Sequence, residues 1–435
     1  MCQNPYSVIS AVKESNWRIE HNCPQCGAPV TLNEADRILL CPYCRTKLYL
    51  VPGDCFRYYI PPPAGPSPDT IYIPYRRMKG LSYSVEESGV SNRFIDTSMA
   101  ATPLRGIPYS LGFRPQVFAL KFVSPHTEGI FLDPHAPPPG TAVIPESLVS
   151  YVSAQASTLS GSSTPPPPSF LNAFIGEMFS VIYTPAYREN NTLYDSVLRR
   201  PVCSLKTGDL DRLLASRTPQ NWKIEFIATL CPECGWDLQG EKDALVMICK
   251  NCSSAWKYRG NKFERVTFTA ITSGDTASHY LPFWRMKAQI AGITLDSYAD
   301  LIRLGNLPKA VTHTFEETPL YFWCPAFKVN PALFLRWARQ MTIYQREGTR
   351  GDLVPGTHLS PVTLPISEAE KSISIMIADI VTDKRGIYPL LHQIRIILTE
   401  CLLEYHPFIE RHRELIHANM HLSLDKKSLA FGVRL

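Results

Sequence analysis

Two sets of four cysteines constrain the fold of this 435-residue chain more than any other feature of its sequence. Each set contains two C-x2-C pairs that are separated by fourteen residues. Paired cysteines at this separation are typical of a site in which four thiolates hold one metal ion. The sequence therefore predicts two tetrathiolate metal sites. Their ligands are Cys23, Cys26, Cys41 and Cys44 in the first set, and Cys231, Cys234, Cys249 and Cys252 in the second.

The expected location also favours metal binding over disulfides. The segment from Met1 to Trp17 has no basic region followed by an apolar stretch, so we expect no secretion signal. No apolar run approaches the about 18 residues of a membrane-spanning helix. We therefore predict a cytoplasmic protein, and disulfides are rare in that reducing compartment. The isolated cysteines are expected to be small buried hydrophobic residues; they are Cys2, Cys55, Cys203, Cys324 and Cys401.

Each cysteine set begins with the sequence C-P-x-C-G. A glycine at this point, Gly27 or Gly235, can adopt the positive φ that lets the chain turn away from the metal. These residues resemble the zinc-ribbon group of small metal-stabilised modules, over about 80 of the 435 residues. Between the pairs we expect a hairpin that joins residues 30–32 to 38–40 in the first ribbon and residue 238 to 245–247 in the second. A third apolar strand should follow, near residues 48–50 and 256–258.

The donor set also bears on the metal and its role. Four thiolates leave no open coordination position, which is typical of a structural site, so we predict two structural Zn²⁺ ions per chain. Iron is the alternative, because rubredoxin-like electron carriers use similar knuckles. Those proteins pair C-P-x-C-G with a second C-P-x-C-G, whereas the second knuckles here end in Arg45 and Ser253, and Lys250 replaces one proline. This departure favours zinc.

Several markers recur in the same order along the chain. The motif Ile73–Lys79 (IPYRRMK) lies 208 residues before Leu281–Lys287 (LPFWRMK), which is also the offset between the cysteine sets. Further on, Tyr183-Thr-Pro and Tyr405-His-Pro are each followed by a leucine at the same distance. Repetition of ordered markers predicts two copies of a segment of about 200 residues.

The predicted fold class is α+β with more strand than helix, as a tandem duplication of a zinc ribbon followed by a mixed α+β module. An apolar fraction of 45% and a charged fraction of 19% are typical of a folded protein, and 38 prolines argue against long helices. Helices are expected after Asn330-Pro331 and after a capping box at Ser367 and Glu370. The predicted parts are an N-terminal tail (1–16), zinc ribbon 1 (17–51), β-rich module 1 (52–136), a Pro/Ser-rich linker or loop (137–169), the end of the first copy with a connector helix (170–220), zinc ribbon 2 (221–266) and α+β module 2 (267–435).

The repeated Arg-Met-Lys sequence offers a second candidate site. On a strand, Arg77 and Lys79 share one face, as do Arg285 and Lys287. Two cations beside an aromatic residue could bind an anionic group of a partner. The structural alternative is that their stems cover apolar surface, or that they lie against the anionic metal cluster.

No sequence motif supports catalysis. The chain has no G-x-S-x-G, no phosphate loop and no H-E-x-x-H, and the late histidines, among them His406 and His417, lack a third patterned metal ligand. The ribbons carry balanced charge and the net charge is only +5, which disfavours nucleic acid without excluding it. We therefore predict a non-enzymatic, zinc-binding scaffold or adaptor that contacts other proteins. The alternatives are a rubredoxin-like iron electron carrier and a nucleic-acid-binding zinc ribbon.

Overall fold

The computed structural model describes residues 17–112, 117–134, 169–205, 208, 222–272, 279–345, 349–351, 358–420 and 422–432. The predicted tail, nearly all of the predicted linker and the predicted connector helix lie outside these residues. Strands account for 45% and helices for 16%, and the strands form several sheets that include a half-barrel. The prediction of tandem zinc ribbons, each followed by a mixed α+β module, is therefore wrong, because sheets dominate the fold.

The chain divides into two compact units that are interleaved in the sequence. Unit 1 comprises residues 1–77, 97–139 and 179–228, and unit 2 comprises 78–96, 140–178 and 229–435. A tandem arrangement would instead place the first two hundred residues together. The physical reason lies in strand β6 (Ile71–Glu86), which continues past Arg77. Its later residues Leu81, Tyr83 and Val85 are buried in the hydrophobic core of unit 2.

Unit 1 contains most of a ten-stranded sheet. The strands run in the order β12-β11-β10-β5-β8-β1-β2, and β6 pairs with β10, β7 and β9. Strands β6, β7 and β10 each contribute residues to both units. The bounds are β1 (Arg18–Asn22), β2 (Pro29–Asn33), β5 (Phe56–Tyr59), β7 (Gly89–Ala100), β8 (Leu120–Phe122), β9 (Ile130–Phe131), β10 (Leu171–Glu189), β11 (Thr192–Asp195) and β12 (Pro201–Ser204).

A three-stranded sheet in unit 1 holds the second half of the first ribbon. It consists of β3 (Ile38–Leu40), β4 (Lys47–Val51) and β13 (Glu225–Ala228), with β4 in the centre. Strand β2 pairs with β1 rather than with β3, so the predicted hairpin between 30–32 and 38–40 is wrong. Alternating apolar residues identify a strand but do not choose its partner. The third strand of this sheet, β13, comes from a distant part of the sequence.

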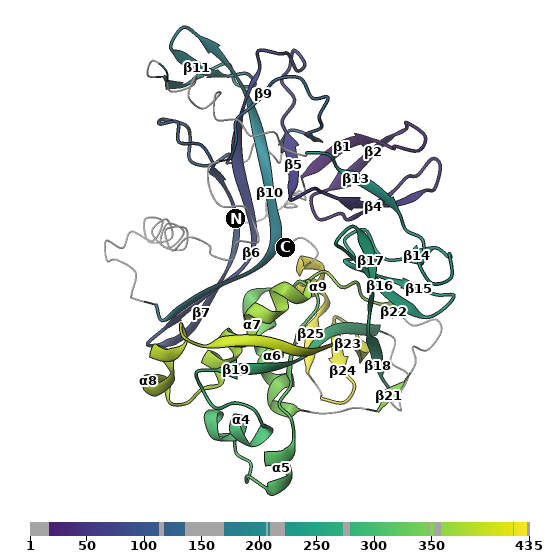
Figure 1. The fold of residues 1–435 in the computed structure, drawn as a ribbon, viewed down its shortest axis with the longest axis vertical. Helices are drawn as coiled ribbons and strands as arrows, with labels where there is room; N and C mark the ends of the chain where they lie inside the picture. Colours follow the sequence, from purple (N-terminus) through teal and green to yellow (C-terminus); the bar gives the residue numbers. More distant parts are fainter. Residues whose placement is uncertain are drawn as a thin grey trace, which may run out of the picture. The chain divides into compact units, whose positions relative to one another are not determined.

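Unit 2 contains the second ribbon as a four-stranded antiparallel sheet, β14-β15-β16-β17 (Figure 1). Here β14 and β15 form a hairpin, as predicted, but Leu238 lies opposite Cys249 and not opposite residues 245–247, so the predicted register is wrong. Strand β16 is the predicted third strand. Strand β17 adds a fourth. The bounds are β14 (Leu238–Gln239), β15 (Val246–Cys249), β16 (Ser254–Arg259) and β17 (Lys262–Val266).

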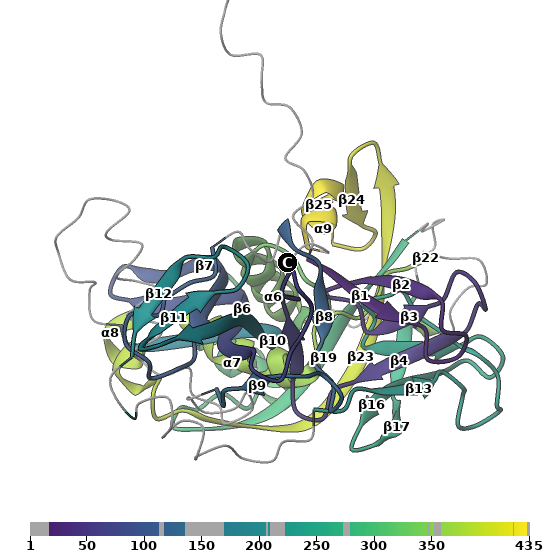
Figure 2. The ribbon, with the colours of Figure 1, turned by 90° about the horizontal axis from the view of Figure 1, so that it is seen from above.

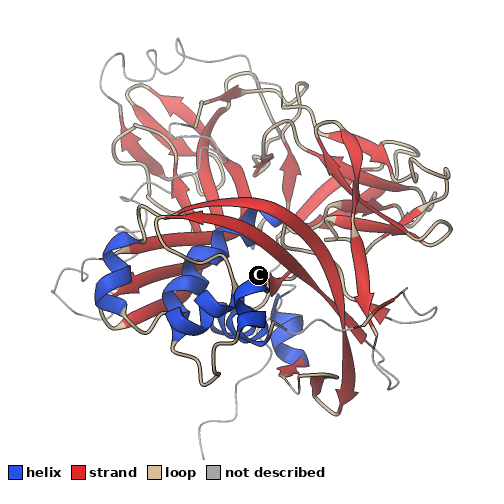
Figure 3. Cartoon of the chain, turned by 60° about the horizontal axis from the view of Figure 1, so that its bottom comes forward, coloured by secondary structure: helices blue, strands red, loops and turns tan. Residues whose placement is uncertain are grey.

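The remaining sheet of unit 2 has eight strands, in the order β20-β19-β23-β18-β21, with β22 on β19 and β24-β25 on β23. The two longest, β19 and β23, run antiparallel to each other. Figure 3 shows long curved strands above a layer of helices, and both α6 and α7 contact β20. The strands are β18 (Phe268–Ile271), β19 (His279–Ala291), β20 (Phe322–Pro325), β21 (Arg350–Gly351), β22 (His358–Leu359), β23 (Arg395–Arg411), β24 (Glu414–His417) and β25 (Ser423–Asp425).

The helices of unit 2 test two sequence-based predictions. Asn330 caps α6, because its Oδ1 accepts a hydrogen bond from the N–H of Leu333, and Pro331 is the first helical residue, as predicted. Helix α7 instead begins at Ile366 after Pro365, without a side-chain cap, so the predicted box at Ser367 is wrong. The bounds are α4 (Tyr298–Gly305), α5 (His313–Glu317), α6 (Pro331–Tyr344), α7 (Ile366–Ile380), α8 (Lys384–Ile387), the 3-10 helix η1 (Tyr388–Leu390) and α9 (Lys426–Gly432).

The recurring motifs occupy strands with corresponding neighbours. The Arg-Met-Lys sequences lie on β6 and β19, and the Tyr-x-Pro sequences lie on their partners β10 and β23. Strand β5 runs parallel to β10, as β18 does to β23, and each long strand then continues into a hairpin, with β11 or with β24. The repeated sequence motifs therefore mark the same pattern of strand pairing in two places of the fold, although the compact units are not tandem copies.

Candidate metal centres

All four cysteine knuckles turn in the same way. The residue after the second cysteine of each knuckle has a left-handed backbone: φ is 73° at Gly27, 61° at Arg45, 74° at Gly235 and 52° at Ser253. At the first three, the N–H donates to the carbonyl of the first cysteine of the knuckle, at 2.8 to 2.9 Å. This tight turn points both thiols of a knuckle to the same side. Arg45 and Ser253 thus adopt the conformation that glycine adopts in the first knuckles.

In the first centre, all four sulfur atoms lie within 4.8 Å of one another. The Sγ atoms of Cys23 and Cys44 are 3.8 Å apart, and those of Cys26 and Cys41 are 3.6 Å apart. A tetrahedral ion with metal–sulfur bonds of about 2.3 Å places its sulfurs about 3.8 Å apart. The separations are far too long for a disulfide, and the cysteines are free thiols. The geometry fits one four-coordinate ion.

The second centre has the same geometry and a well-defined surrounding shell. The Sγ atoms of Cys231 and Cys252 are 3.6 Å apart, and those of Cys234 and Cys249 are 3.5 Å apart. The hydroxyl of the buried Ser254 lies 2.9 Å from the sulfur of Cys252 and accepts a hydrogen bond of 2.7 Å from the indole N–H of Trp256. That bond leaves the hydroxyl proton free to point at a thiolate. Partners of this kind orient metal ligands.

In the second centre, the pKa values of the Cys231 and Cys249 thiols shift in opposite directions. Burial opposes ionisation of Cys231, but hydrogen bonds from backbone N–H groups and from Ser254 lower its pKa to about 6. Burial raises the pKa of Cys249 to about 12, and the neighbouring thiol of Cys234 adds to that rise. Crowded negative charges resist further ionisation unless a positive ion compensates them. The donor set therefore fits a soft divalent ion such as zinc or iron.

Strand pairing and packing support each ribbon. In the first ribbon, Cys23 and Cys41 belong to a core with Leu39, Leu48 and Leu50. In the second, Leu245 donates its backbone N–H to the carbonyl of Val362 at 2.8 Å, which ties the ribbon to the segment after β22. The second ribbon is therefore tied to residues that are distant in sequence.

The structure places the two arginines of the repeated motif inside the protein. Arg77 is buried and donates to both carboxylate oxygens of Glu34, at 3.0 and 3.2 Å, with its guanidinium 4.1 Å from the ring centre of Trp17. Arg285 is buried with its Nε 3.9 Å from the carboxylate of Glu404. These positions fit the structural alternative. Lys79 is also buried and Lys287 is half-buried, and a partner contact for Lys287 stays a prediction.

Sequence reasoning missed the groups that surround the ligands and the arginines. Ser254 follows the last knuckle directly, and a hydroxyl at that position was a usable signal. Glu34 and Trp17 gave no such signal in the sequence. They lie 43 and 60 positions from Arg77, and only folding brings them into contact with it. A pairing of that span is not encoded in local spacing.

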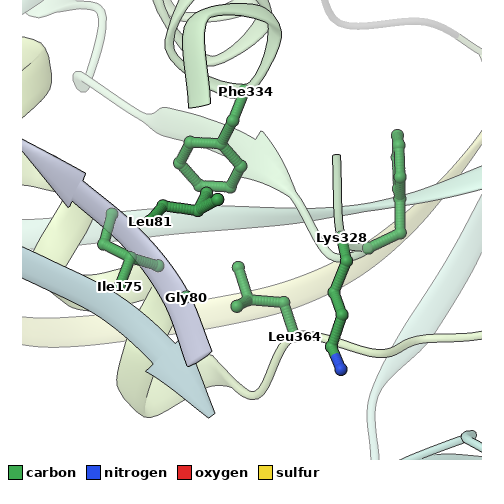
Figure 4. Close-up of a pocket in the computed structure, with 7 residues that line it drawn as sticks. Gly80, Leu81, Ile175, Lys328, Phe334 and Leu364 are labelled. Carbon is green, nitrogen blue, oxygen red and sulfur yellow. The ribbon is translucent and has the colours of Figure 1, made fainter. Parts of the chain in front are cut away.

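A small pocket in unit 2 offers no comparable chemistry. It lies between β6, β10 and α6 and is lined by Gly80, Leu81, Ile175, Phe327, Lys328, Phe334 and Leu364. Figure 4 shows the Lys328 side chain extending past Leu364 and away from Phe334. None of these seven described residues is a cysteine, histidine or carboxylate. Among these seven residues there is thus no carboxylate and no soft metal ligand, and Lys328 is the one ionisable side chain.

No protein-family profile, curated protein or solved structure matches this chain. Within the part of the chain that the structure describes, no helix has both the length and the apolar character needed to cross a membrane. The two tetracysteine clusters are therefore the features on which a functional interpretation can be built.

Proposed function

We propose that both clusters bind Zn²⁺ as closed structural sites, and that the protein acts without catalysis as a cytoplasmic scaffold or adaptor for other proteins. The observation that carries the metal assignment is the sulfur geometry: eight thiols in two groups of four, with separations of 3.5 to 3.8 Å. A tetrathiolate ion has no open position for a substrate, so its role is to hold the ribbon. Metal binding then supplies folding free energy to small modules.

The exposed aromatic residues of the ribbons support the protein-contact part of the proposal. Tyr43 lies inside a knuckle of the first ribbon and is 66% exposed, and Trp236 follows a knuckle of the second and is 59% exposed. Leu40 and Leu230, the residues just before these knuckles, are also exposed. Large aromatic side chains are enriched in protein interfaces. A rigid knuckle presents such a side chain with little loss of entropy on binding.

Metal content tests the proposed sites directly. We expect elemental mass spectrometry of the untagged protein to find two zinc ions per chain, without visible absorption. Cys41→Ser and Cys249→Ser should each reduce the content to one, whereas Cys55→Ser, outside both clusters, should retain two. Iron with visible absorption would replace the proposal by an electron-transfer role. A reduced protein without any metal would refute the sites.

Photo-crosslinking tests the partner. A benzophenone amino acid at position 43 or 236 should form adducts with protein in cells, and the same group at Val311, an exposed residue outside the ribbons, should not. Adducts with nucleic acid at positions 43 and 236 would support the nucleic-acid alternative. Equal labelling from all three positions would contradict a contact role for the ribbons.

A further inference from the structure

Two histidines outside the cysteine clusters lie side by side in the eight-stranded sheet of unit 2. His279 is the first residue of β19 and His358 is the first residue of β22. The two strands pair in parallel, with these histidines opposite each other. Residues in register on paired strands present their side chains on the same face of the sheet. Accordingly, the centres of the two imidazole rings are 5.2 Å apart.

Each ring has one nitrogen beside a carboxylate. Nδ1 of His279 is 3.5 Å from Oε2 of Glu410 on β23. Nε2 of His358 is 3.9 Å from Oε1 of Glu241, in the loop between β14 and β15. A histidine that binds a metal through one ring nitrogen usually directs the other to a carboxylate, which orients the ring. The nitrogens at which an ion would bind are thus Nε2 of His279 and Nδ1 of His358.

The carboxylates near the two rings favour a positive ion. Burial and the charge of the neighbouring Asp243 raise the pKa of Glu241, and a nearby cation relieves repulsion of this kind. Glu410 also contacts the amine of Lys426, the first residue of α9. Figure 2 shows α9 grouped with β24 and β25. Lys426 would oppose a cation at the histidine pair, whereas the three carboxylates would favour it.

The imidazole of His279 is held in the form that binds metals. Burial lowers its pKa, and the positive charges of His358 and Lys426 add to this effect. A metal binds the neutral ring, so the lowered pKa reduces competition from the proton near pH 7. The side chain of His358 is 57% exposed. An ion can therefore reach the pair from solvent.

The separation of the rings also suits a shared ion. Two imidazoles on one tetrahedral ion, with metal–nitrogen bonds of about 2.0 to 2.1 Å, have ring centres about 5 Å apart. We propose that His279 and His358 bind one exchangeable Zn²⁺ ion, with Glu241 and Glu410 as the outer groups that orient the rings. Among the described residues, only the cysteine clusters bring three or more donor atoms within 4.8 Å of one another. The histidine site therefore has two protein ligands, leaves positions to water, and binds more weakly than the closed thiolate sites.

This ion would join parts of unit 2 that are distant in sequence. Glu241 belongs to the second ribbon, whereas the other three groups belong to β19, β22 and β23 of the eight-stranded sheet. The hydrogen bond from the N–H of Leu245 to the carbonyl of Val362 connects the same two parts. Because an ion that binds the folded arrangement stabilises it, Zn²⁺ should strengthen the attachment of the second ribbon to this sheet.

Equilibrium dialysis of the full-length protein against Zn²⁺ tests the site. The protein is first desalted and its resident zinc is counted, so that the cysteine sites are assessed separately. We expect one further ion per chain, bound reversibly. Loss of an outer partner alone weakens metal binding by about 10- to 100-fold, so His279→Gln and His358→Gln, which remove a ligand, should each weaken it by about 100-fold or more.

His313→Gln is the matched control. His313 is exposed and also lies 3.6 Å from a carboxylate, that of Glu317, but it belongs to α5 and not to the pair. This variant should bind the further ion as the wild type does. Glu241→Gln keeps both ligands and should weaken binding by about tenfold.

Hydrogen exchange of the wild-type protein gives a second measurement, which decides the matter should a histidine variant fail to fold. Added Zn²⁺ should slow exchange in β22 and in residues 240–245, and should leave α5 unchanged. The absence of a further ion, undiminished binding in the two histidine variants, or equal protection of α5 would overturn the proposal. Fewer than two zinc ions in the desalted protein would count against the cysteine sites, and the histidine variants would still isolate the contribution of the pair.

Discussion

The guanidinium of Arg77 donates two hydrogen bonds to the carboxylate of Glu34, across 43 positions of sequence, and both side chains are buried. Glu34 lies in the loop between β2 and β3 of the first ribbon, and Arg77 lies on β6. A planar guanidinium that meets a carboxylate through two parallel bonds fixes orientation as well as distance. The pair therefore sets how the loop of the first ribbon lies against the sheet of unit 1.

Breaking this pair should strongly destabilise unit 1. Glu34→Gln removes the negative charge that faces the buried guanidinium, and breaking a buried ion pair in this way costs about 3 to 5 kcal/mol. Replacing both partners, with Arg77→Met and Glu34→Leu, should recover most of that loss. Hydrogen exchange of β2 and β3 peptides measures the effect. Glu316→Gln, which breaks the exposed pair with Arg303, is the control and should cost less than about 1 kcal/mol.

The glycines of the first knuckles should resist substitution for a backbone reason alone. An added Cβ at Gly27 or Gly235 meets nothing within 4 Å, but φ is 73° and 74°. A left-handed alanine costs about 1 to 2 kcal/mol, so Gly27→Ala and Gly235→Ala should release zinc faster to a chelator. Arg45→Gly relieves the same strain and should not speed release. Equal rates for all three variants would contradict this account.

The hydroxyl of Ser254 should contribute to metal affinity in the second centre. Ser254→Ala removes the group that links Trp256 to Cys252, and losses of such outer partners weaken metal binding by about 10- to 100-fold. Competition with a chromophoric chelator measures the affinity. Ser253→Asn changes an exposed neighbour whose left-handed backbone asparagine tolerates, and it should retain normal affinity. A similar loss in both variants would point to a general disturbance of the knuckle.

Removing the metal should expose a clear difference among the cysteines. Burial raises the pKa of the Cys55 thiol to about 11, so at pH 8 about one thiol in a thousand is ionised. After chelation, Cys44 and Cys231, each with a pKa lowered to about 6, should react with iodoacetamide well before Cys55 does. Peptide mass spectrometry before and after chelation follows each site. Rapid labelling of the cluster cysteines before chelation would show that no ion protects them.

The sequence predicted what depends on local spacing. The cysteine pairs, the knuckle glycines and the Asn330-Pro331 start of α6 each rest on residues a few positions apart, and the structure has them as expected. The sequence did not indicate which strands and side chains pair across long distances in the chain. The pairing of β2 with β1, of Arg77 with Glu34 and of His406 with His417 depends on how sheets close, and apolar alternation is compatible with several closures.

Local sequence patterns could not predict the interleaved units, for a related reason. Strand β6 is continuous from Ile71 to Glu86, and nothing in its sequence marks Arg77 as the end of one unit and Met78 as the beginning of the next. The error at helix α7 is of another kind, because here a local motif is present but does not start the helix. Ser367 and Glu370 have capping-box spacing, but Pro365 directs the chain so that the helix begins at Ile366, before the serine. A motif of correct spacing is therefore not sufficient when the backbone upstream is already constrained.

The third strand of the first ribbon's β3-β4 sheet, β13, has a consequence for synthesis. Strand β13 begins at Glu225, whereas the last ligand of the first centre is Cys44. At about 5 to 20 residues per second, the ribosome adds the intervening residues over about 10 to 40 seconds. During that interval one edge of β4 lacks its partner and is open to pairing with other nascent chains. The first ribbon is thus translated early and completed late, and the order of chain growth, rather than final stability, decides when this protein is most prone to aggregate.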